Sequence, residues 1–266
     1  MGMLDELIAR EDTGSIIIDA DSLLFASCYQ FREDYNIELA YMNFMERIGT
    51  IRTACYDKVS KLNDLKIAFT SKTNFRYNIY SDYKASRASK TNEQELLVQN
   101  TKELKKLIYN RVKPIVLVSS TFEADDICVR YAYKGYMVAA IDKDIVNAIP
   151  TISFNYKKAE WNNAKTDEEI KEWYIYQSLT GDSTDGIKGA KKIGKVGATK
   201  FIKELKAGTK NYNDYINLYE TPQDCLLTNQ LVRMNQWDSK GKLKLITMEE
   251  VIKEIQYYDP YKDEEW

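Results

Sequence analysis

Hydrophobic positions along this chain fall into four short β-rich runs separated by segments of helical length. The runs cover residues 15–18, 66–69, 115–118 and 137–141. Alternation of strands with helical segments predicts an α/β fold, with a mostly parallel central sheet flanked by helices. A chain of 266 residues holds one large domain or a domain with an appendage. We expect the α/β core in residues 1–165 and a helical region in residues 166–266.

A long polar stretch, residues 81–110, separates the second run from the third. Its second half, EQELLVQNTKELKKLI, has helical periodicity, whereas YKASRASKTN before it reads as an irregular basic segment. A lone amphipathic helix would explain the second half. It would leave unexplained the basic group that includes Lys84 and Arg87.

Acidic residues follow three of the four runs. Asp19 comes directly after the first, Glu123 shortly after the third and Asp142 directly after the fourth. Because ligand sites in open α/β sheets lie at the carboxyl ends of strands, we expect these acids to converge on one edge. Such a group of like charges is costly unless divalent ions neutralise it. The candidate metal ligands are Asp19, Glu123, Asp125, Asp126, Asp142, Asp144, Asp182 and Asp185.

Oxygen-only ligands favour Mg²⁺ or Mn²⁺. Taken alone, a pair such as Asp125 and Asp126 would usually be solvated surface charge. Clusters of acids at strand ends instead hold two ions roughly 4 Å apart, one activating water and the other stabilising the leaving oxygen of a phosphodiester. Lys84 and Arg87 are then candidates to offset charge on the reacting phosphate.

Carboxylates, glycines and lysines are combined in TGDSTDGIKGAKKIGKVGATKFIK, residues 180–203. We expect Asp182 and Asp185, three residues apart, to point the same way from one helical turn. The glycines that follow suit a backbone that approaches phosphate closely, which predicts a DNA-binding helix-hairpin-helix. A solvated glycine-rich loop is the alternative. The candidate DNA contacts are Gly189, Lys191, Lys192, Gly194, Lys195, Gly197 and Lys200.

Composition removes several other kinds of chemistry. The chain has no histidine, which excludes Ser-His and Cys-His nucleophile pairs, and its four cysteines are scattered without a CxxC pair. No apolar run is long enough to span a membrane and no signal peptide is apparent, so we expect a cytoplasmic protein, in the host cell if a phage encodes it. The formal net charge of −2 is unusual for a nucleic-acid protein. Without the eight candidate metal ligands, however, the remainder is net positive.

The motifs IIIDADSLLF, YKASR, FEADD, IDKD and GDSTDGIKGAKKIGKVGATKF occur in the order seen in flap-endonuclease-like 5′ nucleases, and this resemblance covers roughly residues 16–201. AFTSKTNFR and TNQLVRMNQW make the chain most similar to the 5′-to-3′ exonucleases of short-tailed lytic bacteriophages. The resemblance implies a two-metal site, with Asp19, Glu123 and Asp125 at the first ion. The implied ligands of the second ion are Asp126, Asp142, Asp144, Asp182 and Asp185.

The same resemblance implies that Tyr83, Lys84 and Arg87 lie at the base of a helical arch for a 5′ single strand. It makes residues 189–200 a helix-three-turn-helix that binds duplex DNA with help from a monovalent cation such as K⁺. One departure stands out. Relatives carry an aspartate just after the second strand, which we align with Ser71, and the next acid is Asp82.

We therefore predict a metal-dependent 5′-to-3′ exonuclease and structure-specific flap endonuclease for phage replication and recombination. Its expected partner is duplex DNA with a 5′ end or flap, with RNA primers in RNA–DNA hybrids as a second substrate, and we expect a monomer. Two alternatives stay open: a non-catalytic or weakened DNA-binding paralogue, suggested by Ser71, and a PIN-type ribonuclease, which shares the acidic core.

Overall fold

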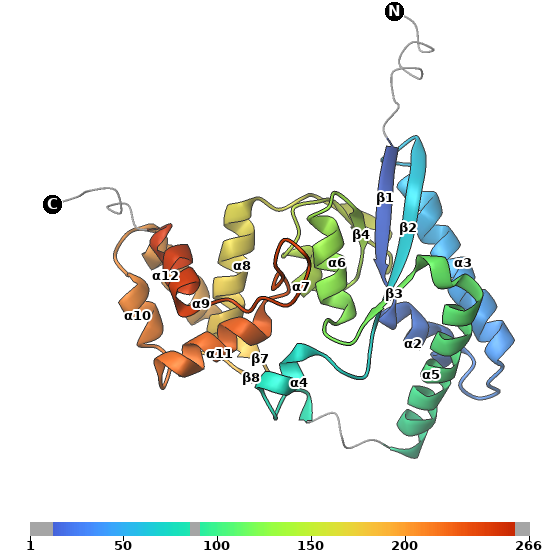
Figure 1. Ribbon diagram of the computed structural model, residues 1–266, viewed down its shortest axis with the longest axis horizontal. Helices are drawn as coiled ribbons and strands as arrows, with labels where there is room; N and C mark the ends of the chain where they lie inside the picture. Colours follow the sequence, from blue (N-terminus) through green and yellow to red (C-terminus); the bar gives the residue numbers. More distant parts are fainter. Residues whose placement is uncertain (1–12, 86–90, 259–266) are drawn as a thin grey trace, which may run out of the picture. The chain divides into compact units, whose positions relative to one another are not determined.

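The computed structural model describes residues 13–85 and 91–258 (Figure 1). Contacts divide the chain into two compact units, the first made of residues 1–74 and 89–165 and the second of residues 75–88 and 166–266. We describe each unit by itself. The boundaries of 1–165 and 166–266 stay predictions about independent domains.

The first unit is built on a six-stranded sheet in the order β3-β2-β1-β4-β5-β6. Its neighbouring strands are parallel except for β5 and β6, which form an antiparallel pair. The predicted mostly parallel sheet is therefore confirmed. The strands are β1 (Thr13–Asp19), β2 (Lys61–Thr70), β3 (Val116–Ser119), β4 (Met137–Ala139), β5 (Ser153–Asn155) and β6 (Glu160–Asn162).

Helices cover both faces of this sheet (Figure 1). On one side, α2 (Asp21–Gln30), α3 (Ile37–Cys55) and α5 (Asn92–Val112) pack together, and α6 (Ala124–Ala132) contacts β1 and β2 from the other side. The short elements η2 (Lys113–Ile115) and α7 (Lys143–Val146) complete the described part of the unit. Strand β1 lies in the middle of the sheet, and its residues Ile16, Ile17 and Ile18 are fully buried. This packing fixes the position of the acidic residue at the end of β1.

Helix α5 confirms the predicted helical periodicity between residues 93 and 108. Thr91 and Gln94 form a capping box at its start. Leu97, Leu104 and Ile108 recur at helical spacing and are buried in the core with strand residues such as Ile67. The irregular segment before α5 includes residues 86–90, which lie outside the described residues, so the helical arch stays a prediction.

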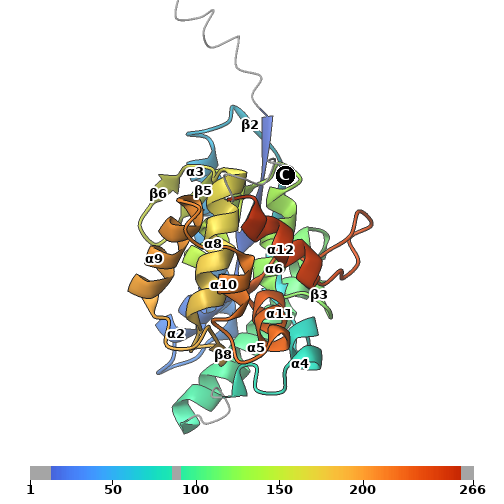
Figure 2. The same ribbon diagram turned by 90° about the vertical axis from the view of Figure 1, so that its left-hand side faces the viewer.

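The second unit is mainly helical, and α8 (Asp167–Thr180) is surrounded by other helices (Figure 2). Its core joins Ile175 and Leu179 of α8 to side chains of four further helices. A two-stranded antiparallel hairpin links α8 to α9. The remaining elements are α4 (Phe75–Ile79), β7 (Gly181–Asp182), β8 (Ile187–Lys188), α9 (Lys195–Lys206), α10 (Tyr212–Ile216), α11 (Pro222–Val232) and α12 (Met248–Gln256).

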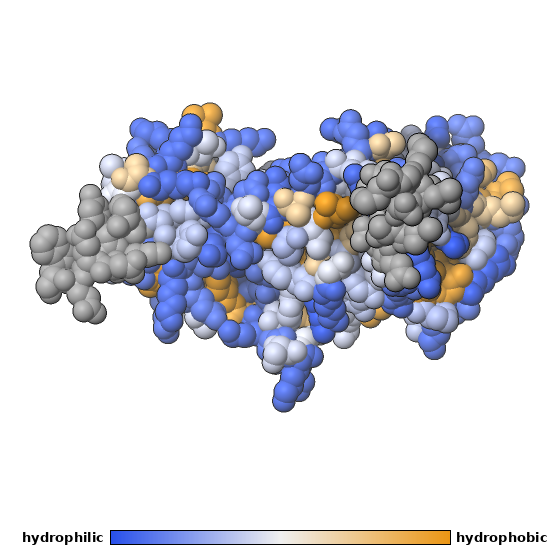
Figure 3. Space-filling view, turned by 90° about the horizontal axis from the view of Figure 1, so that it is seen from above, coloured by the Kyte–Doolittle hydropathy of each residue, from blue (hydrophilic) through white to orange (hydrophobic). Residues whose placement is uncertain are grey.

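Hydrophilic side chains predominate on the face shown in Figure 3, and hydrophobic ones occur there in small groups. Among the described residues, no helix combines the length and the apolar character needed to cross a membrane.

Candidate active site

Carboxylates of the first unit meet at the carboxyl edge of the parallel strands. Asp19 is the last residue of β1, and Ile18 just before it lies beside Ala139 of β4. Asp142 follows β4 and is the N-cap of α7, and Glu123 is the N-cap of α6. The parallel register brings these ends together, so the convergence predicted for the first unit is present.

Burial and repulsion between like charges raise the pKa of two carboxylates at this edge, Asp19 and Asp125. Desolvation, with the charges of Asp21 and Asp142, raises the pKa of Asp19 from 3.8 to about 7. Desolvation also raises the pKa of Asp125 well above its usual range, and four further carboxylates add to the effect. They are Asp19, Glu123, Asp142 and Asp126. These acids therefore share one electrostatic environment.

Several of these side chains make local hydrogen bonds at helix starts. Asp126 accepts a hydrogen bond from the backbone N–H of Glu123 at 2.9 Å, and Asp142 accepts one from the N–H of Asp144 at 2.7 Å. Across residues 13–85 and 91–258, no three acidic or cysteine side chains already form a ligand set for a metal ion. Each of these hydrogen bonds uses one carboxylate oxygen, so the other oxygen can still bind a metal ion.

The donor set nevertheless suits a divalent cation in kind and in number. Asp125 and the four carboxylates whose charges raise its pKa form an oxygen-only group, which is the chemistry that hard cations bind. Burial is the main cause of the raised pKa of Asp19 and Asp125, and repulsion between the acids adds to it. A divalent ion would offset that repulsion.

Asp182 and Asp185 belong to the second unit, and they are not carried by a helical turn as the sequence analysis expected. Helix α8 ends at Thr180, and Asp182 lies in β7, with Asp185 in the turn before β8. The Asp182 carboxylate accepts hydrogen bonds from the N–H groups of Thr184 and Asp185, at 2.8 and 3.4 Å. Gly181, with φ of 65°, ends the helix and starts this hairpin.

Tyr83 and Lys84 both contact Asp185. The Tyr83 hydroxyl donates a hydrogen bond to Asp185 Oδ2 at 3.1 Å, and Lys84 Nζ lies 3.5 Å from the same oxygen. The Lys84 backbone, with φ of 56°, donates its N–H to the Asp185 carbonyl at 2.8 Å. Tyr83 is buried, so its side chain is placed to orient Asp185. Arg87 lies outside the described residues.

The hairpin glycines have different structural settings. A Cβ on Gly189 would lie 2.4 Å from the carbonyl oxygen of Leu179, so this glycine is required by the packing of the hairpin against α8. Gly194, at the start of α9, has open space where a Cβ would stand. Gly197 meets only the side chain of Ile193 at ordinary contact distance. Gly194 and Gly197 are thus the ones that leave room for an external group.

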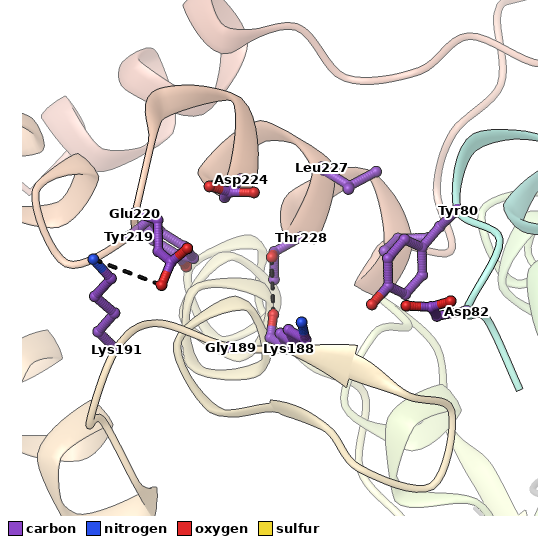
Figure 4. Close-up of a pocket in the computed structure, with 11 residues that line it drawn as sticks. Tyr80, Asp82, Lys188, Gly189, Lys191, Tyr219, Glu220, Asp224, Leu227 and Thr228 are labelled. Carbon is purple, nitrogen blue, oxygen red and sulfur yellow. Dashed lines mark hydrogen bonds and ion pairs between the residues drawn. The ribbon is translucent and has the colours of Figure 1, made fainter. Parts of the chain in front are cut away.

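The candidate lysines of the hairpin are exposed: Lys191, Lys192, Lys195 and Lys200. Lys191 and Glu220 form an ion pair of 3.7 Å beside a cavity of about 350 Å³ (Figure 4). Within this cavity, Thr228 of α11 donates a hydrogen bond to the Lys188 carbonyl at 2.9 Å, which anchors the hairpin (Figure 4). Lys200 pairs with Glu204 one helical turn later at 3.7 Å.

Sequence reasoning missed three polar groups beside the acids of the first unit. Asp21 lies two residues after Asp19 in IIIDAD, so the DxD spacing was an available signal. Thr70 ends β2, and its hydroxyl accepts a hydrogen bond from the N–H of Ala124 at 3.0 Å. Lys105, from α5, donates to the Thr70 carbonyl, a long-range contact that periodicity does not reveal.

Ser71, which the sequence alignment matched to a missing aspartate, lies one residue beyond β2. Its hydroxyl donates a hydrogen bond to the Thr73 carbonyl at 2.6 Å and accepts one from the Thr73 N–H at 3.2 Å. The side chain of Thr70 is the one that contacts the start of α6. The strand therefore presents a neutral threonine at its carboxyl end.

The sequence model described as "5'-3' exonuclease, N-terminal resolvase-like domain" matches residues 15–175, so the chain belongs to this family and is a nuclease that hydrolyses DNA. A 5'-3' exonuclease of Buchnera aphidicola subsp. Schizaphis graminum is 29% identical over 222 residues, covering 78% of this chain and 76% of that protein. A 5'-3' exonuclease of Mycoplasma genitalium is 27% identical over 255 residues, covering 86% and 85%.

Solved structures give the same fold. The T5 5'-exonuclease with bound zinc ions is similar with a TM-score of 0.64 and 16% identity, covering 93% of this chain and 99% of that one. The T5 D15 protein co-crystallised with metal ions has a TM-score of 0.66 and 16% identity, covering 92% and 99%. The predicted resemblance and α/β fold class are thus confirmed.

Proposed function

We propose that this nuclease uses divalent cations to hydrolyse DNA phosphodiesters at a 5′ end or a 5′ flap. The observation that carries the proposal is the position of buried Asp19 and half-buried Asp125 among like charges at the carboxyl edge of the sheet. A protein that only bound DNA would gain nothing from repulsive charge near phosphate. The exonuclease names of its relatives and the metal-bound and DNA-bound T5 structures support the same proposal.

Eight acids are the proposed ligands, and Mg²⁺ or Mn²⁺ the proposed ions. Asp19, Glu123, Asp125, Asp126 and Asp142 are supported by their electrostatic coupling. Asp144, Asp182 and Asp185 are included on the family resemblance. When bound, such ions would lower the pKa of the attacking water and neutralise the negative charge that develops on the phosphate.

The protein's own groups position these acids. Tyr83 orients Asp185 through its hydroxyl, and Lys84 places an ammonium beside the same carboxylate. We propose that Lys84, together with Arg87, offsets negative charge on the reacting phosphate, because such preorganised cations stabilise the transition state more than the ground state. The backbone of Lys84 has a positive φ of 56° and is hydrogen-bonded to Asp185, which holds the Cα–Cβ bond of Lys84 in one direction.

Duplex DNA is the proposed ligand of the hairpin and α9. The first helical N–H groups of α9 follow Gly194 and have no side-chain cap, and exposed lysines surround them. Lys192 and Lys195 are proposed backbone contacts, with Lys191 and Lys200 contributing after their ion pairs yield. K⁺ at the hairpin, RNA–DNA hybrids as substrates and the monomeric state remain part of the proposal.

Cleavage of matched substrates tests this function. A 5′-flap duplex and a blunt duplex, each carrying a 5′ label, are incubated with Mg²⁺, Mn²⁺ or EDTA. We expect short labelled products from the 5′ end of both substrates, a released flap from the first, and no cleavage with EDTA. Cleavage in EDTA, or cleavage of single-stranded RNA alone, would contradict the proposal.

A further inference from the structure

Three helices of the first unit meet at Thr70, the last residue of β2. The Thr70 N–H donates a hydrogen bond to Asp21 Oδ2 of α2 at 3.0 Å. Its hydroxyl accepts one from Ala124 of α6 at 3.0 Å, and its carbonyl accepts one from Lys105 of α5. Each polar group of Thr70 therefore has a partner, and Asp21 and Lys105 are held side by side.

Lys105 brings its ammonium close to the acidic edge. Lys105 Nζ lies 3.9 Å from Asp21 Oδ1 and 5.1 Å from the ring centre of Phe69, and its side chain is only 24% exposed. The neighbouring Lys106 is exposed on the same helix. Helix α5 thus directs one lysine toward the strand end, while the adjacent one is solvated.

Asp21 links this lysine to the acids of the candidate site. The charge of Asp21 acts on Asp19, and Asp19 acts in turn on Asp125. A positive charge beside Asp21 opposes the negative charge that Asp21 adds to this edge. It does so at the end of the strand that carries Thr70 rather than an acid.

We propose that Lys105 is a resident cation of the carboxylate group, a positioning residue that holds Asp21 against Thr70 and limits how tightly divalent ions bind. The proposal rests on the proposed function, because it assumes that these acids bind metal. Lys105 neutralises part of the negative charge when no ion is bound, and it repels an ion that enters. A lysine with a merely structural role would leave the affinity for metal unchanged.

Binding of Mn²⁺ to the full-length protein without DNA tests this inference, by calorimetry at fixed salt and pH. Lys105→Gln retains a hydrogen-bond donor for the Thr70 carbonyl but removes the charge. We expect it to bind Mn²⁺ more tightly by about 3- to 10-fold, the order that one charge exerts on a divalent ion about 6 to 10 Å away in a water-like dielectric. Lys105→Arg, which keeps the charge, and the matched control Lys106→Gln should bind like the parent.

Unchanged or weaker Mn²⁺ binding by Lys105→Gln would overturn the inference. If that variant does not fold, Lys105→Met supplies the same comparison, and Asp21→Asn gives a second one. Removing the acid should weaken Mn²⁺ binding, and unchanged binding would show that the Asp21–Lys105 pair does not act on the ion. If the parent protein binds no Mn²⁺, the proposed function is overturned as well. If the parent binds Mn²⁺ and Lys105→Gln binds it with the same affinity, only the inference about Lys105 is overturned.

Discussion

The hydroxyl of Tyr83 lies 3.1 Å from Asp185 Oδ2, and the ring that carries it is buried against Ile187 and Leu231. Tyr83 thus contacts the Asp185 carboxylate from a core position. The family motif YKASR contributes a structural residue, Tyr83, followed by a charged one, Lys84.

Tyr83→Phe should keep the ring packing and lose this hydrogen bond. We expect the single-turnover rate of flap cleavage to fall by about fivefold, since a hydrogen bond of this kind contributes about 1 kcal/mol. DNA affinity should be unchanged. Tyr77→Phe is the matched control, because Tyr77 is exposed and its ring packs against that of Tyr83. Equal rates for the parent and Tyr83→Phe would show that this hydrogen bond does not position Asp185 for catalysis.

Lys84→Ala tests whether the ammonium beside Asp185 acts on the reacting phosphate. The single-turnover rate should fall by more than about tenfold, a modest share of what transition-state electrostatics supplies. Duplex affinity, measured by fluorescence anisotropy in Ca²⁺, should change little. Alanine at the exposed Lys240 is the control. A loss confined to affinity would make Lys84 an ordinary phosphate contact.

The raised pKa of Asp19 predicts how stability depends on pH without metal. Between its ordinary value of 3.8 and about 7, the folded protein binds more protons at this group than the unfolded chain. Stability from this group is therefore present at low pH and is lost as pH rises through that window. Carboxylates with lowered pKa, such as Asp64 and Glu250, lose their stabilisation only at more acidic pH.

Urea unfolding of the EDTA-treated protein should accordingly show a lower midpoint at pH 8 than at pH 5.5. Added Mn²⁺ should raise the midpoint more at pH 8, because fewer protons compete for the carboxylates. Asp19→Asn should reduce both effects. A urea midpoint that is higher at pH 8 than at pH 5.5 without metal, in both the parent and Asp19→Asn, would contradict a raised pKa for Asp19.

The hairpin lysines should contribute affinity that depends on salt. Replacing Lys191, Lys192 and Lys195 together by alanine should reduce the slope of log affinity against log salt by roughly 2 to 3, if each contacts one phosphate. Lys191 should contribute least, because Glu220 already pairs with it. The control is alanine at the exposed lysines Lys58 and Lys240. An unchanged slope would mean that the hairpin lysines remain solvated.

The fold was largely predictable because strand ends and acids coincide in the sequence. Asp19 and Asp142 each follow an apolar run, and the parallel register brings those ends together. The strands β5 and β6 were not predicted, since three residues each are too few for a period to be recognised. Their pairing depends on tertiary contacts such as that between Phe154 and Trp161.

Local spacing was a poor guide where the backbone changes direction. Asp182 and Asp185 are three residues apart, as in a helical turn, but Gly181 ends α8 and a hairpin carries both acids. The contact between Lys105 and Asp21 was not predicted for a different reason. Asp21 lies in a distant part of the sequence, and only the packing of α5 on α2 brings the two together.

If Asp125 belongs to a metal-dependent catalytic centre, its removal should abolish cleavage without weakening DNA binding. Single-turnover cleavage of a 5′-flap duplex in Mg²⁺ is compared for the parent, Asp125→Asn and the exposed control Asp34→Asn, with DNA affinity measured in parallel. We predict that Asp125→Asn loses cleavage. It should bind DNA at least as tightly as the parent, because the DNA phosphates are repelled by less negative charge. Cleavage by Asp125→Asn within a few-fold of the parent would contradict it.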